Sequence, residues 1–564
     1  MAADFEVPVL IVGGGPVGLS LGAELGWRGS GVLLVEERTA PTEHPKATLL
    51  GARSMEYFRR WGICDAIYAS ALPPEVNYHI TFCTRLAGHE LYRVTSPSIR
   101  DTIERPASAL ARWRELTWSP YYKTQIGQQA LEPILWEFAA AQPSLSLQHG
   151  WRFLDFSQDA TGVSSRIEEL ASGRVATVRS QYLVACDGGA SAIRKTLGIR
   201  MNGRGRMRAN VSFYFRSKAF LDVHGKGLGN LYFVFAHDSF GVFTAIDGHE
   251  FWNYQYYFLD PARQTETLDP ATILHRAVGR RFDFTLVGIQ HWHHHQSVAR
   301  EWRAGRVFLA GDAAHLFVPT GGVGMNTGIG DAIDLGWKLD AVLKGWGGPA
   351  LLNSYEAERK PIAVRNSVIS ANNSDKIDMV MDETPPEIDE ESARGAAARE
   401  RLGGKIRWMA RQFNSAGTHL GYRYIDSPIV VADGSAEPPD DFMQVVPSTW
   451  PGSRLPHAWT GANQTVHGES TLDWFGTHFV LLAATQADAG AAWTDAARAL
   501  GLPFEIRIVG QPELIALLER KLVLVRPDGH VAWRGDVPPA DCAALLRQVS
   551  GNPCSAAIVQ QESA

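Results

Sequence analysis

Three glycine-rich segments, far apart in the chain, combine glycines with acidic residues in patterns that suit a dinucleotide ligand. Residues 13–18 read GGGPVG, and Glu36 follows at the usual distance of an acid that bonds an adenosine ribose. Residues 187–189 read DGG, and residues 311–330 contain Asp312. Glycines let a backbone approach a pyrophosphate or a flat ring, and carboxylates accept hydrogen bonds from sugar hydroxyls. These residues could therefore bind FAD or NAD.

The elements around the first segment make its GxGxxG pattern specific. Residues 7–12 (VPVLIV) predict a buried strand, residues 17–28 a helix, and residues 31–35 (GVLLV) a second strand that ends at Glu36. This order of strand, glycines, helix, strand and acid is the dinucleotide-binding arrangement. Glutamate rather than arginine at that point favours a free 2′-hydroxyl, and hence FAD or NAD over NADP.

Each glycine of the first segment has its own expected task. Gly13 permits the tight turn, Gly15 admits the pyrophosphate, and Gly18 lets the helix pack on the strand. The candidate cofactor contacts of this unit are Gly13, Gly15, Pro16, Val17, Gly18, Glu36, Glu37 and Arg38.

The third segment also predicts a strand, a loop and a helix. Residues 307–310 form a short apolar run, residues 311–330 are rich in Gly, Pro, Thr and Asn, and residues 331–343 return to helical spacing. Such a turn brings backbone N–H groups to an anionic ligand at a helix N-terminus. The segment lacks the GK[ST] ending of a P-loop, so nucleoside triphosphate chemistry is not expected.

Two further features leave alternatives open. Lys46 and Arg53, at the start of a helix predicted within residues 45–62, could meet a pyrophosphate or a ligand ring, or could be solvated. Asp187 could face a ribityl or ribose hydroxyl, or could cap the helix that follows it.

Bulk properties exclude several classes of protein. At 564 residues the chain should hold two or three domains, and its net charge of −6 gives no reason to expect nucleic acid or a membrane surface as partner. The N-terminus lacks the features of a signal peptide, and no apolar run is long enough to span a membrane. The cysteines are scattered without a CxxC pattern, which fits a reducing cytoplasm and makes a disulfide framework or zinc site improbable. They are Cys64, Cys83, Cys186, Cys542 and Cys554.

The middle of the chain predicts strands. Residues 210–260 alternate aromatic and other side chains, as in an antiparallel sheet with one face on a pocket or core. The run HWHHH at residues 291–295 would place His291, His293 and His295 on one face of a strand. Because no nearby cysteine or acid completes a ligand set, an ordinary exposed strand is favoured over a metal site.

The C-terminal part predicts a separate unit. Residues 479–483, 504–509, 522–525 and 531–534 read as strands, with RPDG at residues 526–529 as a hairpin turn. With the helices between them the order is β-α-β-α-β-β-α, the thioredoxin arrangement. No cysteine lies near the first strand–helix junction, so disulfide chemistry is excluded there. We interpret the unit as structural or as part of a subunit interface, and a homodimer is compatible with it.

Three motifs together resemble the class A flavoprotein monooxygenases, the para-hydroxybenzoate hydroxylase-like aromatic hydroxylases. They are GGGPVG with Glu36, CDGGAS with Arg194, and the run GDAAHLFVPTGGVGMNTGIGDAIDLGWKL, which LLNSYEAERKPIA follows. The stretches RLPHAW, STLDWFG and LVLVRPDGHVAWRG resemble the larger members, such as phenol hydroxylases and polyketide aromatic hydroxylases, which carry a thioredoxin-like tail. The resemblance covers nearly the whole chain.

The patterns and the resemblance together imply an α/β chain, α+β overall. A Rossmann-like FAD-binding domain would comprise residues 1–75, 105–200 and 280–375, and an antiparallel-sheet substrate domain residues 76–104 and 201–279. Residues 376–423 would form a helical linker, and residues 424–564 a thioredoxin-like domain without CxxC.

The resemblance also implies roles for individual residues. Asp187 would touch both FAD and NAD(P)H, and Asp312 would meet the ribityl chain. The family usually has Arg at the position of Lys46 and often Asn at that of Gly51, and the catalytic Asp of phenol hydroxylase corresponds to Thr48, so no phenol-deprotonating residue carries over. The other implied flavin contacts are Lys46, Arg53, Gln128, Gly188, Pro319, Gly322, Gly324, Met325 and Asn326.

The implied reaction uses FAD, NAD(P)H and O₂. NAD(P)H would reduce FAD, O₂ would form a flavin C4a-hydroperoxide, and an activated phenol would attack its distal oxygen. The small aromatic substrate that is hydroxylated would be phenolic or polycyclic. A helix beginning near Thr327 would direct its positive end at the flavin, beside the loop that holds Pro319. Only one dinucleotide fingerprint is present, so NAD(P)H would bind transiently.

Activation of a phenol needs a base or donor near its oxygen. The candidates, on the predicted aromatic sheet, are Tyr232, His237, Tyr254 and Tyr256, each of which could instead be a packing residue. A Baeyer–Villiger or epoxidising oxygenase of a polycyclic ketide is an alternative that these motifs hardly separate. A flavin halogenase is disfavoured because GWxWxIP is absent, and a flavin-binding scaffold without turnover is disfavoured by the intact motifs.

Overall fold

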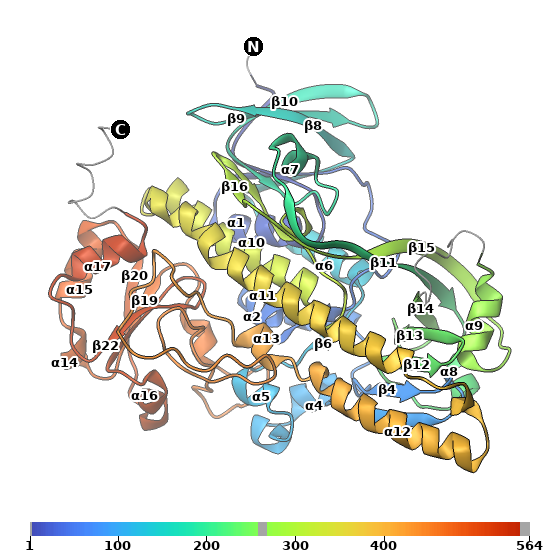
Figure 1. Cartoon of the computed structure of the whole chain (residues 1–564). Coiled ribbons are helices and arrows are strands. Elements are labelled where there is room, and N and C mark those ends of the chain that lie inside the picture. Colours follow the sequence, from blue (N-terminus) through green and yellow to red (C-terminus); the bar gives the residue numbers. More distant parts are fainter. Residues whose placement is uncertain (1–2, 258–267, 553–564) are drawn as a thin grey trace.

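The computed structural model describes residues 3–257 and 268–552 (Figure 1). They fold into three units, each built on a β-sheet, of which the third is the C-terminal unit. Cys64, Cys83, Cys186 and Cys542 carry free thiols. Cys554 and the last residues of the aromatic run, 258–260, lie outside the described residues. The helices of the described ranges include none whose length and hydropathy would let it traverse a lipid bilayer.

The first sheet has the parallel core that the first motif predicted. Strand β2 (Val32–Glu36) is buried throughout and β1 (Phe5–Val12) in its second half, and helices α1 (Pro16–Arg28) and α10 (Val323–Leu343) pack against each other beside the sheet. An antiparallel extension, β8 (Trp151–Gln158) with β9 (Val163–Glu169), continues from β10. The parallel strands, in spatial order, are β17 (Val307–Leu309), β10 (Arg174–Ala185), β1 (Phe5–Val12), β2 (Val32–Glu36) and β7 (Leu145–His149).

The second sheet is antiparallel at each pair except one. Strand β4, which comes from an earlier part of the chain, runs parallel to β12. One face packs on α8 (Phe220–His224) and α9 (Pro270–Val278). The strands, in spatial order, are β18 (His315–Leu316), β15 (Thr285–Ala299), β11 (Met201–Arg216), β14 (Phe251–Tyr257), β13 (Ser239–Ala245), β12 (Leu231–Ala236), β4 (Ile80–Cys83) and β5 (Glu90–Val94).

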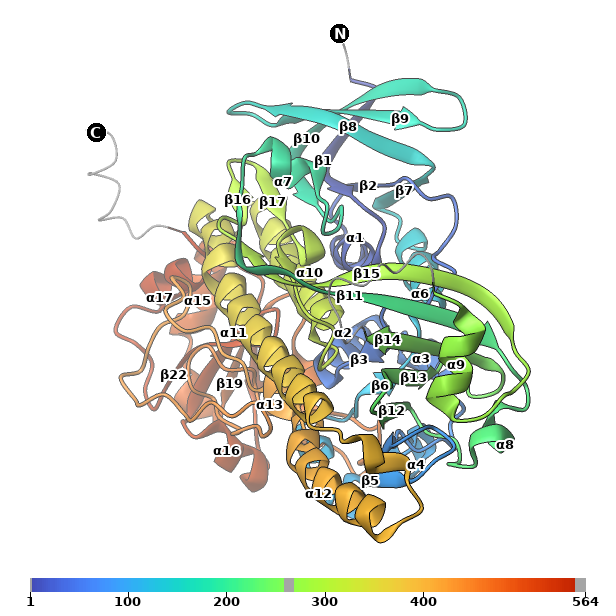
Figure 2. The same ribbon diagram turned by 45° about the vertical axis from the view of Figure 1, so that its right-hand side comes forward.

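The other face of this sheet is partly covered by the segment predicted as a linker. Helix α11 (Pro349–Asp382) crosses the molecule, and α12 (Ala393–Met409) follows it alongside β5 (Figure 2). Ile377 and Ile406 lie in one apolar cluster with Phe82 and Phe233 of the sheet. Residues 376–410 are therefore part of the wall of the second unit.

One predicted helix begins earlier than expected. Helix α10 starts at Val323 rather than near Thr327, because Gly321 and Gly322 adopt positive φ angles of 93° and 62° and complete the turn earlier. Helix α6 (Gln128–Ala140) follows the short strand β6 (Thr124–Gln125), which pairs with β3 (Leu49–Leu50).

The C-terminal unit has the predicted order of elements. Its sheet has the order β20-β19-β21-β22, with β19 parallel to β20 and antiparallel to β21. The hairpin closes where Gly529 N donates to Arg526 O at 2.9 Å. Its elements are β19 (Phe479–Ala483), α14 (Gln486–Ala489), α15 (Ala492–Ala499), β20 (Phe504–Ile508), α16 (Pro512–Leu518), β21 (Leu522–Val525), β22 (Val531–Gly535) and α17 (Cys542–Val549).

Candidate active site

A cavity of about 930 Å³ lies between the first and second sheets and brings the three glycine-rich segments together. Residues of the motifs line one part of it, and the second sheet with α11 and residues 412–415 lines the other. The motif residues that line it are Gly13, Gly15, Pro16, Val17, Glu36, Glu37, Arg38, Lys46, Gln128, Asp187, Gly188, Asp312, Pro319, Gly322, Gly324 and Met325.

The glycines of the first motif have three different surroundings. Gly13 has φ 106°, and a Cβ there would lie 2.3 Å from the carbonyl oxygen of Cys186. A Cβ on Gly18 would lie 1.9 Å from Gly13 O, so helix α1 approaches the turn only with glycine at that position. A Cβ on Gly15 would meet no atom within 4 Å. Gly13 and Gly18 thus serve the turn and the packing, while Gly15 leaves space for a ligand.

Glu36 ends β2 at the cavity wall, as its position in the sequence predicts. Its carboxylate accepts a hydrogen bond from Gly14 N and two more from Arg38, from the backbone N and from Nε, both at 2.9 Å. Arg38 also contacts Glu132. These contacts fix the Glu36 carboxylate beside the glycine turn.

The second motif presents an unpaired acceptor to the cavity. Asp187 Oδ2 accepts from Ile193 N at 3.3 Å, whereas Asp187 Oδ1 is buried without a partner in the described structure. Arg194 donates to Ala313 O and to Gly189 O, both at 2.9 Å. Because Arg194 joins the second and third motifs in this way, Asp187 and Asp312 reach the same cavity.

The Asp312 side chain lines the cavity and is exposed to it. Desolvation by the protein around the cavity raises the pKa of Asp312, and the nearby His315 and Lys46 oppose the rise. His315 itself contacts Asp331 Oδ2 at 2.7 Å and stacks on Phe317 with ring centroids 4.7 Å apart. Phe317 lines the cavity, so the buried hydrogen bond between His315 and Asp331 supports its wall.

Asn326 holds the third motif in shape rather than lining the cavity. Its Oδ1 accepts from Gly51 N and Ser54 Oγ, both at 2.7 Å. Its Nδ2 donates to Leu49 O at 2.9 Å and Gly322 O at 2.7 Å. The first turn of α10 carries no acidic residue and reaches the cavity through Gly324 and Met325, so its positive end opens onto the cavity.

Arg53 lies away from the cavity wall. It donates to Glu56 Oε2 and to the carbonyl oxygen of Asp528, both at 2.9 Å, and its guanidinium lies 4.4 Å from the ring centroid of Tyr57. This position gives no support to a direct contact between Arg53 and a cofactor, because the guanidinium is hydrogen-bonded to the hairpin of the C-terminal unit.

The four candidates for substrate activation lie away from the cavity as well. Tyr232, Tyr254 and Tyr256 point to the opposite face of the second sheet, where they pack in the main core. The hydroxyl of Tyr232 donates to Gly227 O at 2.7 Å and accepts from Gly229 N at 2.6 Å. His237 lies exposed at the β12–β13 turn. Because successive residues of a strand face opposite sides of the sheet, the sequence neighbours of these tyrosines line the cavity instead.

These neighbours form the wall that sequence reasoning missed. On the sheet it is mainly apolar, and it includes polar atoms that are buried without partners in the described structure: Asn230 Oδ1, Gln125 Nε2, and both Oε1 and Nε2 of Gln412. The period-two alternation could have indicated the sheet residues, whereas Lys123 and Gln412 carry no local signal. The wall comprises Ile80, Lys123, Gln125, Asn230, Leu231, Phe233, Val242, Thr244, Gln255, Tyr257, Trp292, Ile377, Gln412, Phe413 and Ser415.

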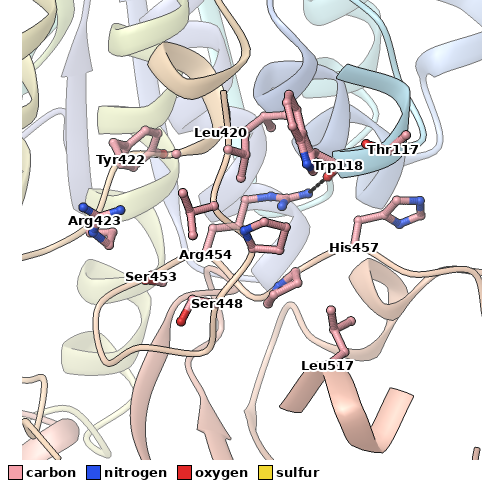
Figure 3. A pocket seen from close by; sticks show the side chains of 15 residues that line it. Thr117, Trp118, Leu420, Tyr422, Arg423, Ser448, Ser453, Arg454, His457 and Leu517 are labelled. Carbon is pink, nitrogen blue, oxygen red and sulfur yellow. Dashed lines mark hydrogen bonds between the residues drawn. The ribbon is translucent and has the colours of Figure 1, made fainter. Parts of the chain in front are cut away.

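A second, smaller pocket of about 110 Å³ lies between α5 (Glu115–Trp118), residues 420–423 and the C-terminal unit. Figure 3 shows Arg454 reaching across it to the carbonyl oxygen of Trp118, at 3.0 Å. This pocket shares no lining residue with the cavity and contains none of the motif residues.

The cavity fits an FAD molecule on three structural grounds. Gly15 leaves open space where a pyrophosphate would approach. Asp187 Oδ1 lacks a partner that a sugar or ribityl hydroxyl would supply. The first N–H groups of α10, which have no intrahelical acceptor, open onto the same space.

Comparison with known proteins defines the class. Residues 6–368 match the FAD binding domain family, and residues 448–553 match the aromatic-ring hydroxylase C-terminal family. The chain is 34% identical to a putative polyketide hydroxylase of Streptomyces halstedii, with 96% of each chain covered. It is 31% identical to the 2,4-dichlorophenol 6-monooxygenase of Cupriavidus pinatubonensis, with 97% of this chain and 96% of that one covered.

A solved structure agrees with the sequence relatives. The rebeccamycin biosynthetic enzyme RebC with reduced flavin has a TM-score of 0.87 and 36% identity, with 98% of this chain and 100% of that chain covered. The chain therefore belongs to the FAD-dependent aromatic-ring hydroxylases, as the motifs predicted. It is a flavin-dependent monooxygenase with FAD as cofactor, and it consumes NAD(P)H and O₂.

Proposed function

We propose that this enzyme hydroxylates a phenolic, polycyclic aromatic substrate held between the glycine-rich loops and the second sheet. The observation that supports this most is that one continuous cavity joins the motif residues to a wall of apolar side chains and amides. Its volume of about 930 Å³ lies near the upper end of the usual range for ligand sites, which suits a flavin ring and a large flat substrate together. The polyketide and rebeccamycin enzymes among its relatives point to substrates of that size.

Within this proposal, each motif binds one part of FAD. Residues 13–18 and Glu36 would hold the ADP part, Asp187 and Asp312 the ribityl chain, and residues 319–325 the ring. Bound FAD supplies electron transfer from NAD(P)H and the activation of O₂. The positive end of α10 stabilises negative charge on the ring, and Phe317 and the apolar sheet residues exclude water.

The proposal includes domain boundaries and surroundings. The FAD-binding domain would comprise residues 1–75, 105–200 and 280–375, and the substrate domain residues 76–104 and 201–279 with the helices of residues 376–423. Residues 424–564 would form the thioredoxin-like domain. We propose a cytoplasmic location and no nucleic-acid partner, and we propose a homodimer through the C-terminal unit. The lack of a CxxC pattern in this unit supports a structural role for it.

The test is product analysis by mass after incubation with NADH or NADPH and a panel of phenols, naphthols and hydroxyanthraquinones. One added oxygen with an intact ring system supports hydroxylation. An added oxygen that opens a ring or forms a lactone would instead support the Baeyer–Villiger alternative. NAD(P)H oxidation that no aromatic compound stimulates would contradict the proposal.

A further inference from the structure

Lys123 places a buried positive charge at the wall of the cavity, outside the glycine-rich motifs. It immediately precedes β6, is 9% exposed, and lines the cavity beside Gln125 and Gln412. Its Nζ donates to the carbonyl oxygen of Phe413 at 2.6 Å. An ammonium group carries three donors, so with Phe413 O and the adjacent Tyr122 as partners one remains for another acceptor.

This ammonium has no direct counter-ion. Within residues 3–257 and 268–552, Lys123 forms no ion pair with a carboxylate within 4.0 Å of Nζ, and the buried Glu115 acts on it from a greater distance. Desolvation disfavours the charged form, but the adjacent Tyr122 and the buried Glu115 outweigh it and raise the pKa of Lys123. Desolvation, together with the positive charges of Lys123 and Arg365, lowers the pKa of His419 to about 4. His419 therefore carries no charge near neutral pH. A buried cation without an ion-pair partner is unfavourable unless a bound group supplies the missing negative charge and hydrogen-bond acceptors.

The side-chain amides next to Lys123 also lack hydrogen-bond partners among the described residues. Gln412 is 3% exposed and Gln125 is 2% exposed. In the described structure both polar atoms of the Gln412 amide, and Nε2 of Gln125, have no hydrogen-bond partner. Buried polar groups are nearly always paired, so their location at one cavity wall indicates a ligand with oxygen atoms.

Resting on the proposed function, we infer that Lys123 binds an ionised hydroxyl of the aromatic substrate, with Gln412 and Gln125 bonding an adjacent oxygen substituent. The substrate class is therefore a phenolate that carries a neighbouring carbonyl or hydroxyl group. Binding breaks the phenol O–H bond, its proton passes to water, and the electron pair stays on the oxygen that faces the ammonium. The anionic ring is more electron-rich, which prepares it for attack on an electrophilic oxygen. Lys123 thereby supplies the activation that the four candidates of the second sheet do not.

The experiment compares two ligands on the FAD-loaded oxidised enzyme, without turnover. One is 1-hydroxyanthraquinone, whose hydroxyl neighbours a carbonyl, and the other is its methyl ether, which cannot ionise. Dissociation constants are measured from the change in flavin absorbance, and the ionisation of the bound hydroxyl from the ligand's own visible band as pH is varied. The variants are Lys123→Met, which removes the charge at similar length, and Lys123→Arg, which keeps it. Lys218→Met, at a lysine whose side chain is 79% exposed, is the matched control.

The expected result for Lys123→Met is a loss of about tenfold or more in affinity for the ionised ligand, with a change of less than about threefold for the methyl ether. The bound hydroxyl should also ionise at a higher pH than in the parent enzyme, whereas Lys123→Arg and Lys218→Met should keep the parent behaviour. Equal losses for both ligands, or an unchanged ionisation, would overturn the inference, as would a parent enzyme that binds only the neutral form. Product formation is scored separately, so oxygenation of an aromatic compound without a Lys123 effect would leave the proposed function standing.

Discussion

Replacing Arg526 with Met should destabilise the whole enzyme, because Arg526 is the buried link between the C-terminal unit and the FAD-binding helices. Its guanidinium is 0% exposed and contacts Glu358 of α11 at 2.5 Å, Asp334 of α10 at 3.3 Å and Asp528 of its own hairpin at 2.6 Å. Lys338 completes the cluster, with Nζ at 2.7 Å from Asp334 and 2.6 Å from Glu358.

The charges of this cluster balance in the parent enzyme. Burial raises the pKa of Asp334 to about 8, against the effect of Lys338, so this group is largely protonated near neutral pH. Burial alone would also raise the pKa of Glu358, but Arg526 and Lys338 outweigh it and hold that pKa below its usual value. Asp528 is likewise held low, chiefly by Arg526. Two carboxylates thus face two cations, and removal of Arg526 leaves one carboxylate uncompensated.

Leaving a buried charge without its partner costs about 3–5 kcal/mol, a large part of the 5–15 kcal/mol that usually stabilises a folded protein. The free energy of unfolding of Arg526→Met should fall by that amount near neutral pH. Urea unfolding followed by circular dichroism measures it. Arg520→Met, on the same unit but in a 3.8 Å surface pair with Asp536, is the control and should change stability by less than about 1 kcal/mol.

The pH dependence follows from the direction of the carboxyl shifts. Carboxylates with a lowered native pKa contribute stability that is present above their unfolded pKa of about 4 and is lost as pH falls through the native value. The variant lacks that contribution from Glu358 and Asp528. Its deficit, the difference in free energy of unfolding between parent and variant, should therefore be greatest near neutral pH and should decrease on acidification. A variant as stable as the parent near neutral pH, or a deficit that widens at low pH, would refute the reasoning.

Two further predictions concern the cavity. Gly15→Val should abolish FAD retention while the protein stays folded, because a Cβ at this position meets no protein atom within 4 Å and would fill the space of the pyrophosphate. Flavin absorbance of the purified protein measures FAD retention, and circular dichroism measures folding. A yellow, FAD-loaded variant would contradict this prediction. Gly18→Val is the contrasting variant, expected to fail in folding because its Cβ would lie 1.9 Å from Gly13 O. Tyr254→Phe should leave kcat and KM within about twofold of the parent, because Tyr254 packs on Phe243 on the far face of the second sheet and removal of its hydroxyl costs only a weak bond to Ser239. A tenfold loss of kcat with unchanged stability would show that this tyrosine does act on the substrate.

The motif residues could be predicted from the sequence because their signal is local. The glycines, Glu36, Asp187 and Asp312 each follow a short apolar strand, and a parallel sheet brings the ends of its strands to one edge. The spacing of these motifs is therefore enough to place them in a common site.

The wall opposite those motifs could not be predicted in the same way. Alternation separates Phe233 from Tyr232 but does not say which of the two faces a ligand, since both faces of the second sheet are apolar. Arg53 is bound by the carbonyl oxygen of Asp528, and Lys123 by that of Phe413. Contacts between residues so far apart in the chain leave no pattern in either segment.

The measurement that tests the central claim most directly is oxygen-isotope incorporation. The FAD-loaded enzyme is given NAD(P)H, a hydroxylated polycyclic aromatic compound that stimulates oxidation, and isotopically labelled O₂ in ordinary water. We expect one labelled oxygen atom on a ring carbon of the product, and no product with Gly15→Val. Label that is absent from the product, or oxygen that comes from water, would contradict the account of this enzyme as a flavin-dependent aromatic hydroxylase.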